Sequence, residues 1–144
     1  MPSIEFAFLA DAAEVAPGQK FNVLGGGVSR ISGPAIPFQH PHLALVVGLR
    51  MTPAERNKEH ELEFILEAPD KSRVASSSGR IVAHGPPDPN DFILTVAVDL
   101  WNLMLSAAGD YSVRILVGGT ERKRLPLVVV QTGTQPVPEQ RYLA

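Results

Sequence analysis

The side chains with the clearest chemical potential are the histidines, which are His40, His42, His60 and His84. His40 and His42 are two positions apart, and this spacing places two imidazoles on one face of a strand, where they could bind a metal ion. Pro41 separates them, and no carboxylate follows at the tight spacing that would complete a ligand set. Asp88 and Asp91 could approach a histidine only through folding. We therefore expect no cofactor, with His40 and His42 as the candidates for metal ligands and solvent or backbone as the favoured partner of each imidazole.

Three other patterns suggest catalysis or nucleotide binding but lack the residues that such chemistry needs. The triplet Gly25–Gly27 precedes Val28–Ile31 rather than the Gly-Lys-Ser/Thr of a phosphate-binding loop, so it indicates a bulge or a close approach of two backbones. Ser76–Ser78 lacks the Gly-x-Ser-x-Gly elbow of a nucleophilic serine. The remaining pattern is a set of alternating carboxylates, predicted to lie in solvent: Glu59, Glu61, Glu63 and Glu67. The sequence therefore predicts no catalytic residue.

Alternating apolar positions predict the strands that would hold these residues. From 59 to 68, Leu62, Phe64 and Leu66 face one way and the glutamates face the other. The other long inward-facing sets are Leu43, Leu45, Val47, Leu49 and Met51; Phe92, Leu94, Val96, Val98 and Leu100; and Tyr111, Val113, Ile115 and Val117. Residues 73–83 form a weaker, serine-rich segment that we expect at a sheet edge. The pattern is typical of antiparallel sheets with one face in water.

Two short segments favour helical turns between or within these strands. Thr52, Pro53 and Glu55 fit a capping box with proline at the first helical position, which predicts one turn near 53–57. Residues 11–14 suggest a second single turn, ended by Pro17 and Gly18. Neither segment continues with the apolar spacing of a long helix.

Tyr111 refines the fold because it follows a turn and begins a strongly alternating strand. In immunoglobulin-like and fibronectin-like sandwiches, a tyrosine at the corner before the penultimate strand donates its hydroxyl to upstream backbone. An ordinary buried tyrosine is the alternative. Either reading fits an all-β, immunoglobulin-like or fibronectin-like antiparallel β-sandwich of seven to nine strands with one or two short helical turns.

The order of these motifs resembles that of a family of small, uncharacterised bacterial proteins, a domain of unknown function. The matching segments are 6–15, 17–27, the turn at 69–71 and the region from Ala108 through Tyr111, and the resemblance extends over most of residues 4–130. Two positions depart from the family pattern: Lys71 replaces a common glycine, and Gly118-Gly119 replaces a common Asp-Gly. The resemblance implies an immunoglobulin-like sandwich and brings no activity.

Composition excludes several classes of function. The chain has 144 residues, a formal net charge of -2 and no cysteine, which excludes disulfides, thiolate metal sites and cysteine nucleophiles. The small net charge gives no case for nucleic acid, and no apolar stretch reaches the ~20 residues that cross a bilayer. The first residues do not match a secretory signal, so the cytoplasm is the expected location. We expect one β-sandwich domain over 1–130 and a polar, proline-containing tail over 131–144.

Four apolar side chains are the candidates for an interface. Trp101 and Met104 lie where alternation breaks, and Tyr142 and Leu143 lie near the end of the polar tail. These residues favour a non-enzymatic interaction or assembly module, either a homo-oligomer or a binder of a protein partner, without nucleic acid or membrane. The alternative is a small-ligand or metal-binding protein, possibly a hydrolase, that uses histidines and nearby carboxylates.

Overall fold

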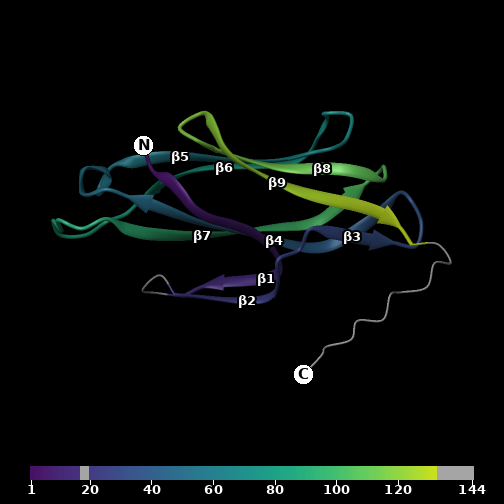
Figure 1. Cartoon of the computed structure of the whole chain (residues 1–144), viewed down its shortest axis with the longest axis horizontal. Helices are drawn as coiled ribbons and strands as arrows, with labels where there is room; N and C mark the ends of the chain where they lie inside the picture. Colours follow the sequence, from purple (N-terminus) through teal and green to yellow (C-terminus); the bar gives the residue numbers. More distant parts are fainter. Residues whose placement is uncertain (17–19, 133–144) are drawn as a thin grey trace, which may run out of the picture.

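The computed structural model describes residues 1–16 and 20–132. In these residues, nine strands form two sheets that lie face to face (Figure 1). The first sheet contains, in spatial order, β2 (Phe21–Gly26), β1 (Ser3–Val15), β4 (Phe38–Met51) and β7 (Phe92–Leu105). The second contains β3 (Arg30–Gly33), β9 (Thr120–Gln131), β8 (Gly109–Val117), β5 (Glu59–Glu67) and β6 (Arg73–Val82). The prediction of an all-β fold with seven to nine strands is confirmed.

The core lies between the two sheets and is formed by the predicted inward-facing residues. Leu43, Leu45 and Val47 of β4 have no exposed surface, and they share one cluster with Phe64 of β5 and Ile115 of β8. Full burial of such a side chain contributes roughly 1.5–3 kcal/mol through the hydrophobic effect. Period-two alternation therefore correctly identified the faces that pack together.

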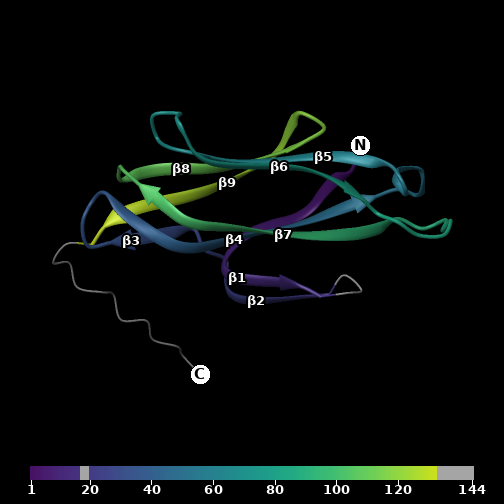
Figure 2. The same ribbon diagram turned by 180° about the vertical axis from the view of Figure 1, so that it is seen from behind.

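The outer face of the first sheet is also covered, contrary to the prediction of one face in water. Ala44 and Val46 point away from the core and yet are completely buried. The second half of β1 bends under the sheet and pairs with β2, and both views show this hairpin as a layer beneath β4 and β7 (Figures 1 and 2). Phe21 of β2 packs with ring centroids 5.6 Å from Phe6 and 6.3 Å from Phe8.

The helical turn predicted at residues 11–14 is wrong, because this segment belongs to β1. Ala12 pairs with Leu24, and Glu14 pairs with Asn22, so cross-strand pairing overrides the local preference. At the other predicted site, a three-residue 3₁₀ turn spans Pro53–Glu55, where the Thr52 amide donates to Glu55 Oε1 at 2.8 Å.

The sequence had suggested purely antiparallel sheets, but the second sheet contains one parallel pair of strands. β3 pairs with β9 in parallel, with Ile31 opposite Val129. The long excursion from β3 to β9 allows this arrangement, since adjacent parallel strands cannot be joined by a tight turn. β6 lies at an edge of the second sheet, as predicted for the serine-rich segment.

Tyr111 makes the predicted bond to upstream backbone at the entry to the penultimate strand. Its hydroxyl donates to the Ala107 carbonyl at 2.8 Å, and the residue is almost completely buried. This bond fixes the turn between β7 and β8 against the core.

Candidate functional site

The free edge of β7 differs from the other sheet edges in length and composition. Within residues 1–16 and 20–132, β7 pairs only with β4, so one side of this 14-residue strand has no neighbour. Its sequence contains neither lysine, arginine nor proline, and Asp99 is its one charged residue. Proteins usually protect an exposed edge with basic residues, proline, bulges or short strands. The first ten residues of β7 carry none of these devices.

Apolar surface remains accessible on both faces of β7. Leu94, Val96 and Val98 pack against the core but are only partly buried, whereas their partners on β4 have no exposed surface. On the outer face, Trp101 is 65% exposed, and near the end of the strand Met104 is 50% exposed. Both of these interface candidates are therefore exposed, while their role in an interface stays a prediction.

His42 fixes the position of both Trp101 and the one charge on this edge. Its Nδ1 lies 2.7 Å from the Asp11 carbonyl oxygen, and its Nε2 lies 2.7 Å from Asp99 Oδ1. Both neighbours are hydrogen-bond acceptors, so the imidazole is held between two oxygens that come from different strands. The imidazole also packs on the Trp101 indole, with ring centroids 4.1 Å apart. The His42 side chain, which belongs to β4, thus contacts both β1, at its bend, and β7.

The break in alternation at the end of β7 has a backbone cause. Asn102 adopts a left-handed conformation with φ of 51°, which asparagine tolerates better than most residues. After it, Leu103 and Leu105 point into the core, although the residues that point inward before it are the even-numbered ones. The regular alternation of side chains along the free edge therefore ends at Trp101, although β7 stays paired with β4 to Leu105.

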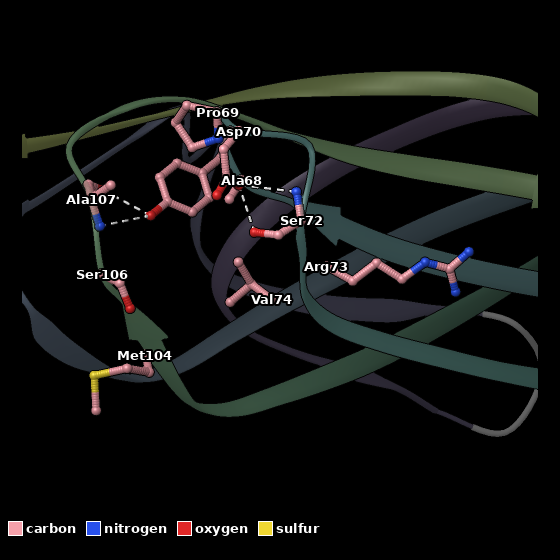
Figure 3. Close-up of a pocket in the computed structure, with 10 residues that line it drawn as sticks. Ala68, Pro69, Asp70, Ser72, Arg73, Val74, Met104, Ser106 and Ala107 are labelled. Atoms are coloured by element: carbon pink, nitrogen blue, oxygen red, sulfur yellow. Dashed lines mark hydrogen bonds between the residues drawn. The ribbon is translucent and has the colours of Figure 1, made fainter.

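A pocket of about 310 Å³ lies beside the end of β7, between the turn from β5 to β6 and the turn from β7 to β8 (Figure 3). Met104 and Val74 supply apolar walls. Two of the polar residues that line it are bonded to each other: Asp70 accepts from the Ser72 hydroxyl at 2.6 Å and from the Ser72 amide at 3.0 Å. These bonds hold the pKa of the Asp70 carboxyl below its ordinary value. The pocket thus offers shape rather than a set of catalytic groups.

The histidines do not assemble into a metal site in the described ranges. No group of three histidine, aspartate or glutamate side chains there could hold an ion. His42 is bonded to Asp11 and Asp99, and His60 Nε2 lies 2.9 Å from the Glu55 carbonyl oxygen, as predicted for imidazoles with backbone partners. The Nε2 atom of His40 is buried and has no hydrogen-bond partner among residues 1–16 and 20–132.

The glycine triplet has the structural role that its sequence indicated. Gly25 and Gly27 have positive φ angles, and a side chain at Gly25 would collide with the Asp11 carboxylate. β3 follows at Arg30, so the glycines open no helix that could bind a phosphate. The close approach of β2 to β1 needs glycine here.

One of the glutamates predicted to lie in solvent is buried instead. Glu67 is 9% exposed, because Arg114 of β8 and Arg124 of β9 cover it at 3.3 Å and 3.8 Å. Glu59 and Glu61 are exposed, as expected. Alternation indicated the correct face for Glu67 but could not show that arginines from two other strands would enclose it.

Two of the predicted interface residues, Tyr142 and Leu143, lie outside the described residues. The predicted tail begins at Gln131, the last residue of β9, and the Thr132 amide donates to the Gly33 carbonyl at 2.9 Å. The division into a domain and a tail stays a prediction. Sequence analysis missed the pocket and the covering hairpin, and only the three phenylalanines at 6, 8 and 21 could have indicated the latter.

The fold and this edge define a two-sheet, all-β protein with one long unprotected strand. The profile of a family of unknown function, DUF6941, matches residues 5–130, so the chain belongs to that family. Comparison with curated proteins finds no match. In the described ranges, no helix has the length and apolar character needed to cross a membrane.

Proposed function

We propose that this protein is a non-enzymatic interaction module with an immunoglobulin-like sandwich, and that it binds protein partners by strand addition at the free edge of β7. In strand addition, main-chain hydrogen bonds supply affinity and alternate side chains supply specificity. The observation that carries the proposal is the length of this edge without a basic residue or proline. The Tyr111 corner and the two facing sheets support the immunoglobulin-like assignment.

Trp101 supports the choice of this edge over the others. Tryptophan is enriched among the residues that dominate binding energy at interfaces. Here the indole is held by His42 and yet remains mostly exposed, so its orientation is set before a partner arrives. A side chain that is ordered in advance loses less conformational entropy on binding.

The alternative of a metal or ligand site built on histidines gains no support from the described geometry. The ring nitrogens of His42 point at protein acceptors, and His60 bonds to a backbone carbonyl. No second function is therefore proposed. A bacterial origin and a cytoplasmic location stay predictions from the sequence.

Affinity purification from cells of the source organism, after chemical crosslinking, tests this function. Wild type is compared with Trp101→Lys, which places a charge on the edge, and with Leu24→Lys, which changes a side chain that is 72% exposed on β2. We expect at least one protein, a second copy included, to be retained by wild type and Leu24→Lys and reduced about tenfold with Trp101→Lys. Slower amide exchange in β7 of the purified complex would locate the contact. The proposal would be contradicted if every retained protein were recovered equally with wild type and Trp101→Lys, and if amide exchange in β7 were unchanged in the purified complex.

A further inference from the structure

Resting on the proposed function of the β7 edge, we propose that its partner is a second copy of this chain. The two β7 strands pair antiparallel around Ala97, and the two four-stranded sheets become one continuous sheet across a two-fold axis. In such a contact the same patch is used on both copies, which closes the assembly at two chains.

The charge of the edge favours a second copy. Asp99 is the one charged residue of β7, and its carboxylate lies 2.7 Å from the Nε2 atom of His42. An edge with a single carboxylate among apolar side chains offers little to attract a strongly basic or acidic strand, and a second copy presents the same apolar side chains to it. β6, the edge of the other sheet on the same side, carries exposed serines and the ion-paired Arg73 and Arg80, so its side chains are polar and do not match the apolar side chains of β7.

The backbone limits the register. Because Asn102 leaves the extended conformation, the pairing stretch ends at Trp101. Directly opposite residues in an antiparallel pair point to the same face, and a two-fold arrangement centred on Ala97 uses the nine residues from Ile93 to Trp101 in full. A register centred on Asp99 would place two carboxylates opposite each other and would shorten the pairing.

The side chains that this register brings together are complementary on both faces. On the outer face, Trp101 of each copy lies opposite Ile93 of the other, and Asp99 lies opposite Thr95. On the inner face, Leu94 meets Leu100 and Val96 meets Val98 of the second copy. Three of these four kinds of contact, all except the one between Asp99 and Thr95, therefore cover half-buried or exposed apolar side chains of β7. Two tryptophans, each able to bury roughly 150–250 Å², add the apolar area that main-chain pairing alone lacks.

Cysteine crosslinking tests the register on a clean background, because the natural chain has no cysteine. In the proposed dimer, Ala97→Cys brings two Cβ atoms to about 4.5–5.5 Å, close to the range that a disulfide spans. Ser77→Cys on the exposed β6 edge is the matched control. Under mild oxidation, we expect Ala97→Cys to form covalent dimer at least about tenfold faster than Ser77→Cys. A mixture of Ile93→Cys and Trp101→Cys chains should give the mixed dimer faster than either variant gives its own.

Light scattering of the full chain supplies the second measurement. Wild type and Leu24→Lys should show twice the 15.5 kDa of one chain, and Trp101→Lys should show one chain, with circular dichroism confirming that the variants are folded. A monomer at all concentrations, or a dimer in which Ala97→Cys crosslinks no faster than Ser77→Cys, would overturn the inference. If another protein from the source cells nevertheless depends on Trp101, the proposed function stands and only the identity of the partner is wrong. If no protein depends on it, both fail.

Discussion

β6 and β7 lie against each other on the same side of the sandwich, and each is the edge of its own sheet, yet they are built in opposite ways. β6 has three consecutive exposed serines, and its two arginines pair with Glu63 at 3.9 Å and Glu59 at 3.5 Å. β7 has apolar side chains on both faces and one carboxylate, Asp99, which bonds to His42. Since both edges experience the same solvent, this difference in composition is the basis for our proposal that β7, and not β6, pairs with another strand.

The largest effect on stability in this comparison is expected from His42→Ala. The substitution removes the bonds to Asp11 and Asp99 and the contact with Trp101, and it leaves Asp99 without its partner. Hydrogen bonds to charged groups contribute about 1.5–3 kcal/mol each, so we expect a loss of roughly 2–3 kcal/mol in the free energy of unfolding, measured with urea. The matched control, His84→Ala, replaces an exposed histidine and should change stability by less than about 0.5 kcal/mol. Equal losses for both variants would show that His42 does not anchor the edge.

Tyr111→Phe is expected to have the next largest effect. It removes the hydroxyl that donates to the Ala107 carbonyl where β7 ends, and it leaves that carbonyl without this partner. The cost should be about 1–2 kcal/mol, typical of a lost hydrogen bond at a buried site. Thermal unfolding should show a lower Tm, and amide exchange should rise at the end of β7 while β6 stays unchanged. A uniform rise across both edges would contradict the local role of this bond.

A smaller effect, dependent on pH, is expected where β6 begins. Bonds from Ser72 lower the pKa of the Asp70 carboxyl in the folded protein. A carboxyl with a lowered pKa adds stability above its unfolded pKa of about 3.9, and this contribution is lost as pH falls through the folded value. Asp70→Asn should therefore be less stable than wild type near neutral pH, and the difference should narrow below about pH 4. Glu61→Gln, at an exposed carboxylate, is the control, and a constant difference at all pH values would refute the assignment.

The smallest effect is expected from Arg80→Ala on β6. The ion pair with Glu59 is exposed at both ends, and such pairs contribute about 0–1 kcal/mol. We expect the free energy of unfolding to change by less than about 0.5 kcal/mol. Crosslinking through Ser77→Cys should be faster when Arg80→Ala is also present, because the edge loses a protecting charge. A large loss of stability without new association would show that the arginine supports the fold rather than guards the edge.

Sequence reasoning identified the strands and their inward faces because alternation is a local signal that burial between two sheets reinforces. It also placed Tyr111 between a turn and a strand, but it left open whether the hydroxyl bonds to upstream backbone, which the structure shows. It failed where distant segments decide the outcome. Residues 11–14 prefer a turn locally but gain a strand partner in β2, and Glu67 is enclosed by arginines from β8 and β9. His42 could not be recognised as an anchor, because its partners lie 31 and 57 residues away in the chain.

The bend in β1 has a consequence for how the protein opens. One continuous strand pairs with β4 through its first half and with β2 through its second half, so the sheet and the layer that covers it share a backbone. Phe6 packs directly over Gly48 and also against Phe21, which ties the two layers at a second point. The cover therefore cannot peel away as an independent lid. We expect the amides of β2 and β4 to exchange in a single cooperative unit, and local fluctuations to stay confined to the strand edges.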